Sequence, residues 1–173
     1  MLKSPHPPRK RQGFTLIELM VTIVVLAVLA TIAAPSFTPL MERWRVRSVA
    51  EELQSTIYYA RSEAIKRGGG VTIKPTKNED WATGWIVADR DDNPLQETAA
   101  PTNVEIRPDV DAPPLPTTLY LDRWGMVSDS NAGAAIALDF LVAPSGKNNN
   151  ATRLCAGTGG RIVLNKDGGA CPT

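Results

Sequence analysis

The sequence predicts an α+β protein in which a long N-terminal helix precedes a domain of short β-strands. Residues 19–34 are predominantly apolar and carry no charge, which predicts a helix that is apolar on every side. From residue 46 the apolar positions recur every three or four residues, as on one face of an amphipathic helix. After the glycines at residues 68–70 the chain changes to short β-like segments separated by turn-rich pieces.

A basic leader occupies residues 1–13. Its charge is +4, whereas the rest of the chain sums to −3, because it has no acidic residue and four basic ones, Lys3, Arg9, Lys10 and Arg11. It contains nothing that could form a core, so we interpret it as a cytoplasmic leader. Positive charges in front of an apolar run favour an orientation with the N-terminus inside the cell.

The apolar run has three interpretations. Residues 14–34 span about 21 positions, which is longer than the apolar core of about 7–15 residues in a secretory signal peptide. A plain membrane anchor needs about 20 residues and fits the length, but it leaves Glu18 unexplained. A carboxylate in the middle of a membrane costs roughly 2.5–3.5 kcal/mol, and such residues usually have a partner. The third interpretation supplies that partner.

The stretch GFTLIELM, with a basic leader before it and an apolar helix after it, resembles the class III leader and N-terminus of type IV pilins and type II secretion pseudopilins. The resemblance implies that a prepilin peptidase cleaves between Gly13 and Phe14 and that the new amine of Phe14 is methylated. It also implies that Glu18 pairs with the N-terminal amine of a neighbouring subunit and so sets the register between subunits. Pro35 lies where many pilins have a proline that kinks the helix.

The amphipathic continuation covers residues 41–67. Its apolar stripe consists of Val46, Ala50, Leu53, Ile57, Ala60 and Ala64. We therefore expect one helix over residues 14–67, bent or locally broken at its two prolines and ended by the glycines that follow. Residues 14–40 then form the transmembrane or pilus-core half, and residues 41–67 lie against a globular domain of residues 68–173.

Residues 50–73, AEELQSTIYYARSEAIKRGGGVTI, resemble the FimT/FimU and H-type pseudopilin group within that family. The resemblance implies a pilin-like fold, in which a C-terminal antiparallel β-sheet or small β-sandwich packs on the amphipathic helix. The residue patterns predict strands at residues 71–74, 81–88, 104–107, 118–121, 135–142, 153–155 and 161–164.

The two cysteines, Cys155 and Cys171, lie 16 residues apart and follow a membrane-directing N-terminus. This context favours one disulfide in an oxidising compartment, with a reduced pair as the alternative. A zinc site is disfavoured, because only two thiols are present and the single histidine, His6, belongs to the leader. We expect neither a metal nor another cofactor.

No residue pattern predicts an enzyme. Without the leader the chain has no histidine, which excludes serine or cysteine catalysis through a histidine base. Asp89, Asp91 and Asn93 have the spacing of the start of a calcium-binding loop, but Pro94 and Ala100 stand where a glycine and a glutamate should follow. A solvated acidic turn is the simpler interpretation, with calcium binding as the alternative.

The charge of the globular region changes sign along the chain. Residues 68–139 have 5 basic and 12 acidic residues, a net charge of −7. Residues 140–173 have a net charge of +3, from one aspartate against Lys147, Arg153, Arg161 and Lys166. A basic patch can contact phosphates, so DNA binding by these four residues is a hypothesis. FimT-like proteins have a C-terminal Gly-Arg-x-Arg motif associated with DNA binding, of which GRIV at residues 160–163 keeps only the first arginine.

From the resemblance we expect a minor type IV pilin of the FimT/FimU type, which acts in pilus assembly or priming and is not an enzyme. Two alternatives stay open: a DNA-binding minor pilin for DNA uptake in natural transformation, and the H-type minor pseudopilin of a type II secretion system. The expected partners are other major and minor pilins or pseudopilins, the prepilin peptidase, the inner membrane and, in one alternative, DNA. The expected location is the inner membrane, crossed once, with a periplasmic C-terminal domain, and then the cell-surface pilus.

Overall fold

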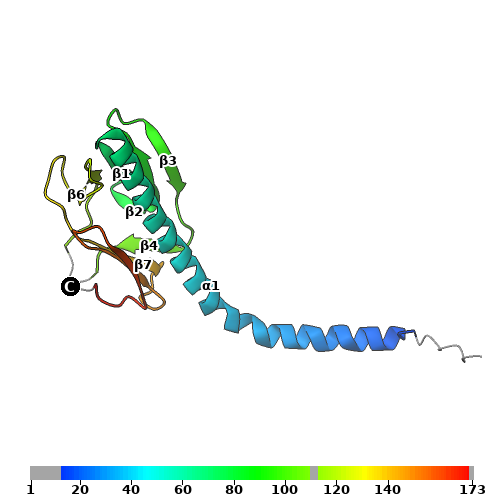
Figure 1. Ribbon diagram of the computed structural model, residues 1–173. Helices are drawn as coiled ribbons and strands as arrows, with labels where there is room; N and C mark the ends of the chain where they lie inside the picture. Colours follow the sequence, from blue (N-terminus) through cyan, green and yellow to red (C-terminus); the bar gives the residue numbers. More distant parts are fainter. Residues whose placement is uncertain (1–12, 110–112, 172–173) are drawn as a thin grey trace, which may run out of the picture. The chain divides into compact units, whose positions relative to one another are not determined.

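The computed structural model describes residues 13–109 and 113–171, except for the side chains of residues 33–36 (Figure 1). It divides into two compact units, Met1–Thr38 and Pro39–Thr173. The leader before Gly13 and the side chain of Pro35, at which the sequence predicts a kink, lie outside the described residues. The described part is α+β, as predicted.

The helix α1, Leu16–Arg67, begins two residues later than predicted and ends where predicted. Its start is set by Thr15, whose Oγ1 accepts a hydrogen bond from the backbone N–H of Glu18 at 3.3 Å, as an N-cap does. At its end Gly69 adopts φ = 95°, a value that favours glycine, and donates its N–H to the carbonyl of Ala64 at 2.7 Å.

Length and apolar composition decide whether a helix can cross a membrane. Within the described residues, no helix taken alone is long and apolar enough to cross a membrane. The segments Leu16–Ile32 and Phe37–Arg67 meet the criteria of length and composition only when they are taken together as a bent pair.

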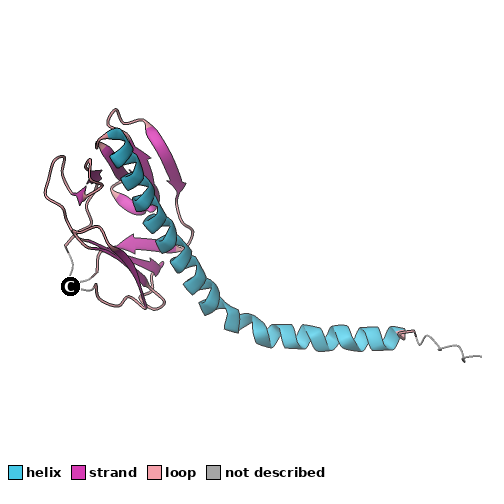
Figure 2. Cartoon of the chain, in the orientation of Figure 1, coloured by secondary structure: helices cyan, strands magenta, loops and turns pink. Residues whose placement is uncertain are grey.

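In the second unit, the described strands form two antiparallel sheets (Figure 2). The first has the order β3-β2-β1-β5-β6 and consists of β1 Val71–Lys77, β2 Asp80–Ala88, β3 Pro94–Ala99, β5 Leu119–Leu121 and β6 Val127–Ser128. The second has the order β4-β7-β8-β9 and consists of β4 Val104–Arg107, β7 Leu138–Pro144, β8 Thr152–Ala156 and β9 Ile162–Lys166. β1 pairs both with β2, its neighbour in sequence, and with β5, where Val71 lies opposite Leu121.

The part of α1 in the second unit buries the predicted stripe. Its fully buried side chains are Val46, Ala50, Leu53, Ile57, Ala60 and Ala64. They share one core with both sheets, in which Trp81 and Phe140 meet edge to face with ring centroids 5.1 Å apart. The second buried indole, Trp85, donates its N–H to Oγ1 of Thr56 at 3.0 Å, which ties the first sheet to the helix by a buried hydrogen bond.

Each predicted strand is present, but the structure has two further strands and several different bounds; β1, for example, ends at Lys77, three residues after the predicted end. The sequence predicts no strand at β3, PLQETA, because half of its residues are polar and it begins with a proline, features that an edge strand tolerates. β2 and β3 approach closely at Gly84, where a Cβ would lie 2.3 Å from the carbonyl oxygen of Thr98. β6 has only two residues and is also missed. β7 begins at Leu138, three residues after the predicted start.

Candidate functional site

The predicted processing motif lies in the first unit, at the start of α1. Among the described residues, no atom lies within 4 Å of where a Cβ at Gly13 would be, and Phe14 is exposed. Glu18 occupies the first turn of the helix, where the partial positive charge of the free N–H groups favours a carboxylate. Cleavage, methylation and the pairing of Glu18 with a neighbour stay predictions.

The first unit presents a continuous apolar surface. The large apolar side chains between Phe14 and Ile32 are 51% to 83% exposed. Burial of one such side chain stabilises by roughly 1.5–3 kcal/mol, so this surface is stable only when lipid or other apolar helices cover it. Glu18 is the one charged residue between residues 14 and 41. Once the surface is covered, this carboxylate needs a cationic partner, because an isolated buried charge is strongly unfavourable.

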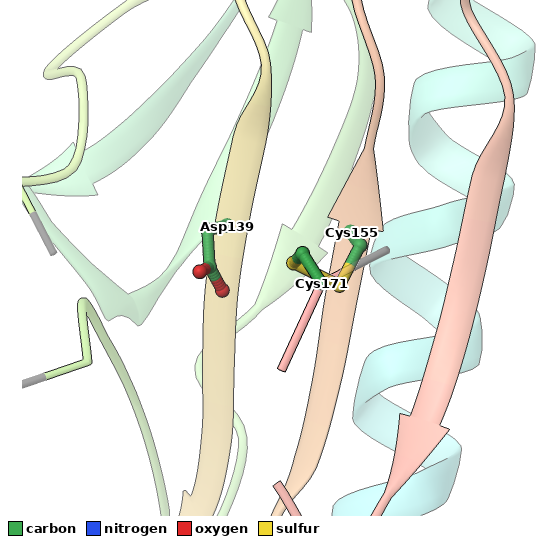
Figure 3. Close-up of side chains that lie close together, drawn as sticks. All are labelled: Asp139, Cys155 and Cys171. Carbon is green, nitrogen blue, oxygen red and sulfur yellow. A yellow bond between two sulfur atoms is a disulfide. The ribbon is translucent and has the colours of Figure 1, made fainter. Parts of the chain in front are cut away.

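The predicted disulfide is present. Cys155 on β8 is bonded to Cys171, which follows β9, and their Cα atoms are 5.5 Å apart. The carboxylate of Asp139 on β7 lies beside the bond (Figure 3), and the carboxylate oxygen and both sulfurs lie within 4.8 Å of one another. Sulfurs joined in a disulfide have no thiolate to offer a metal ion. In this form the cluster is therefore a crosslink that ties the segment after β9 to the second sheet.

Arg153 is buried, so the prediction that it contacts DNA from the surface is wrong. Its side chain is 9% exposed, and its guanidinium forms ion pairs with Asp109 and, at 3.6 Å, with Asp139. All five residues of β8 are buried, so an arginine at this position has carboxylates in place of water. Burial raises the pKa of the Asp139 carboxyl above its ordinary value, an effect that Arg153 opposes and Asp109 reinforces.

The other three basic residues do not form one patch, so the predicted common surface is also wrong. Lys147 is engaged by Glu42, with 2.5 Å between Nζ and Oε1. Arg161 directly precedes β9 and Lys166 is its last residue, and both are exposed. Five residues of extended chain separate them, which at a rise of about 3.4 Å per residue is about 17 Å.

The predicted acidic turn at residues 89–93 is confirmed. Oδ1 of Asp89 accepts the backbone N–H groups of Asp91 at 3.0 Å and Asn93 at 2.9 Å. The hydrogen bonds from Asn93 are the largest of the effects that hold the pKa of Asp89 below its ordinary value, and the charge of Arg67 contributes. The turn therefore satisfies one oxygen of this carboxylate with its own N–H groups.

Two exposed tryptophans were not predicted as functional residues from the sequence. Trp44 on α1 is 65% exposed, and Trp124 between β5 and β6 is 74% exposed. Trp44 precedes the first stripe residue, Val46, by two positions, so it lies off the buried stripe. A helical projection would have found it, whereas the turn sequence around Trp124 contains no such signal.

Comparison with known proteins identifies the family. A model of the family described as type II transport protein GspH matches residues 49–170, and a model of the prokaryotic N-terminal methylation motif matches residues 8–34. The chain therefore belongs to the GspH family of minor type IV pilins and pseudopilins. It carries the N-terminal motif of proteins that are anchored in a membrane and that interact with other pilins or pseudopilins in a pilus or pseudopilus.

Individual relatives agree with the family. The chain is 38% identical over 69 residues to the fimbrial protein EcpB of Eikenella corrodens, an alignment that spans 40% of this chain and 43% of that protein. The fold is similar to that of the type IV minor pilin FimU of Pseudomonas aeruginosa, with a TM-score of 0.59 and 22% identity over 76% of this chain and 96% of FimU. It is also similar to the minor pseudopilin EpsH of the Vibrio cholerae type 2 secretion system, with a TM-score of 0.50 and 14% identity over 72% and 99% of the two chains.

Proposed function

We propose that the chain is a minor type IV pilin that acts in pilus assembly or priming and has no catalytic role. It is held in the inner membrane, with its C-terminal domain in the periplasm, until it enters the fibre. The observation that carries the proposal is the exposed apolar surface of residues 14–32 with Glu18 as its one charge, a surface that packs well among similar helices. The local similarity to a fimbrial protein supports a pilus.

The geometry at the start of α1 gives a physical reason for pairing between subunits. Cleavage after Gly13 creates a positive amine on Phe14, two residues before the helix begins. A cation at this end of a helix is disfavoured by the helix dipole, whereas the carboxylate of Glu18 in the first turn is favoured. A neighbouring subunit shifted along the helix axis brings its Glu18 to this amine, and the charge pair then forms where apolar helices exclude water.

Two measurements test the proposal. N-terminal sequencing of the chain from cells with a prepilin peptidase should begin at Phe14, and a start after a later small residue such as Ala30 would instead indicate signal peptidase. Glu18→Ala should stay in the membrane fraction, because removing the charge makes insertion easier, and should be missing from sheared pili. The matched control is Glu51→Ala, which removes an exposed carboxylate from the second half of α1. Normal incorporation of Glu18→Ala would overturn the role of the carboxylate.

A second candidate is the H-type minor pseudopilin of a type II secretion system. It is favoured by the GspH model, which matches most of the second unit. Co-purification from membranes with identification of the partners separates the two: pilins would support the first candidate, and pseudopilins the second.

DNA uptake is the least supported alternative. Of the four basic residues proposed to bind DNA, Lys147 and Arg153 form ion pairs, and only Arg161 and Lys166 are exposed without an ion pair among the described residues. Absence of DNA retardation at about 50 mM salt, where phosphate contacts are strong, would dismiss it.

A further inference from the structure

A pocket lies in the second unit between the first turns of its helix and the ends of two strands. We call it the collar pocket. Its volume is about 340 Å³, and its lining consists of Leu40, Arg43, Trp44, Arg47, Asn150, Ala151, Thr152, Lys166 and Asp167. The proposed role of the chain in pilus assembly or priming does not involve this pocket.

The helical side of the collar pocket has the composition of a membrane interface. Leu40 and Trp44, both in the lining, are exposed, and Trp44 is the more exposed of the two. Tryptophan is enriched at membrane–water interfaces, where its apolar ring and polar N–H face different surroundings. The pocket follows directly on residues 19–41, which carry no charge, so it lies at the point where the chain leaves an apolar environment.

The polar side of the pocket is basic, with three of its side chains cationic and one, Asp167, anionic. Arg43 is held in place by a 2.6 Å hydrogen bond from its Nε to Oδ1 of Asn150, which leaves its terminal nitrogens free to bind another acceptor in the described structure. Arg47 is partly neutralised by Glu51 at 2.7 Å, whereas Lys166 is exposed and has no ion pair among the described residues.

The surrounding charges do not cancel this basic character. Glu42, next to Arg43 in the sequence, is engaged by Lys147. The charged lining residues and their charged neighbours in sequence or ion pairs have two more basic than acidic residues, namely Arg43, Arg45, Arg47, Lys147 and Lys166 against Glu42, Glu51 and Asp167.

We propose that the collar pocket binds the phosphate of an anionic phospholipid headgroup while the chain is anchored in the membrane. The inference rests on the membrane anchoring in the proposed function. Arg43 and Lys166 contact the phosphate from two different elements, and Trp44 and Leu40 lie against the upper part of the acyl chains. Continuity with the uncharged run selects a membrane as the occupant over a soluble acidic partner, because lipid headgroups are already present at that depth.

The experiment measures which lipid lies next to Trp44 in the full-length chain. Trp124→Phe removes the other exposed indole, and Trp81 and Trp85 are buried in the core. The protein is reconstituted into phosphatidylcholine vesicles in which a fraction of either phosphatidylcholine or phosphatidylglycerol is brominated, and quenching of fluorescence is recorded. Attraction of about 1 kcal/mol between a basic residue and anionic lipid corresponds to a roughly fivefold enrichment of that lipid. Brominated phosphatidylglycerol at about a tenth of the lipid should therefore quench Trp44 as strongly as brominated phosphatidylcholine at about half.

Matched variants locate the effect. Arg43→Gln with Lys166→Gln should bring the quenching by equal mole fractions of the two brominated lipids close to equality, and salt at about 1 M should do the same by screening. Lys77→Gln, which removes an exposed lysine at the end of β1, should leave the preference unchanged.

The outcomes are distinguishable. Equal quenching by the two lipids at the same mole fraction, in the chain that carries only Trp124→Phe, overturns the inference and leaves membrane anchoring intact. Absence of quenching by either lipid, with release of the chain by alkaline carbonate, refutes the anchoring itself. A preference that survives Arg43→Gln with Lys166→Gln also overturns the inference. The inference is also overturned if Arg43→Gln with Lys166→Gln keeps its lipid preference but, after solubilisation in detergent, no longer co-purifies with an acidic neighbouring subunit. The occupant of the pocket is then a protein.

Discussion

Replacement of Arg153 by methionine tests whether the second sheet depends on a buried charge network. Methionine keeps most of the length and apolar stem of arginine but removes the cation that Asp109 and Asp139 share. Breaking a buried ion pair by removing one partner costs about 3–5 kcal/mol. Because the side chains of Asp109 and Asp139 keep 36% and 31% of their exposure, water relieves part of the loss, and we expect a cost of about 3 kcal/mol.

The assay is thermal and urea unfolding of a chain that begins at Pro39, followed by the fluorescence of its buried tryptophans. For a unit of this size, about 3 kcal/mol corresponds to a fall in the melting temperature of roughly 10 °C. Arg161→Met is the matched control, because Arg161 is exposed, and it should change stability by less than about 0.5 kcal/mol. Adding Asp139→Asn to Arg153→Met should restore part of the loss, since it removes an acid left without its cation. A loss below about 1 kcal/mol for Arg153→Met would refute the reasoning.

Three further predictions concern the same domain. Cys171→Ser should destabilise it by roughly 3 kcal/mol, from the closure of a loop of about 16 residues, and mass spectrometry without reductant should show two hydrogens fewer in the unaltered chain. The pKa of Asp139 is higher in the folded than in the unfolded chain, so the folded chain binds the proton more tightly. The unfolding free energy of the unaltered chain, minus that of Asp139→Asn, should therefore increase as the pH is lowered from 7 towards about 4. A decrease in this difference would contradict the direction of the pKa shift. Thr56→Val leaves the indole N–H of Trp85 without its acceptor and should cost about 1–3 kcal/mol in the same unfolding assay, with an unchanged midpoint as the contrary result.

The helix was predictable because each signal for it is local. The spacing of the stripe from Val46 to Ala64 reports directly which side chains face the core, and the glycines after Arg67 define the end. The start shifts by two residues because Thr15 uses its side chain as a cap, a choice that hydropathy does not register. The processing motif was equally predictable, since its residues are contiguous.

The sheets and their charges were less predictable because they depend on distant partners. β3 has an edge position in which polar residues are tolerated, so its composition resembles that of a turn. Arg153 lies 44 residues from Asp109 and 14 from Asp139, and a sum of charges along the sequence treats all three as exposed. An arginine within the apolar strand TRLCA was the one available indication that it is buried.

The pairing of β1 with both β2 and β5 has a consequence for the order in which the domain can form. α1, β1, β2 and β3 follow one another in sequence, so their contacts close only short loops and can be made as soon as those residues are available. The contact of Val71 with Leu121 encloses about 50 residues, including β4 of the other sheet, and its loop-closure entropy is larger. A substitution that weakens β5 should therefore act on a later step of folding than one in the β1–β2 hairpin. While the domain folds, the first sheet has an unpaired edge along β1 until β5 arrives, and an unpaired edge is a site for wrong strand pairing.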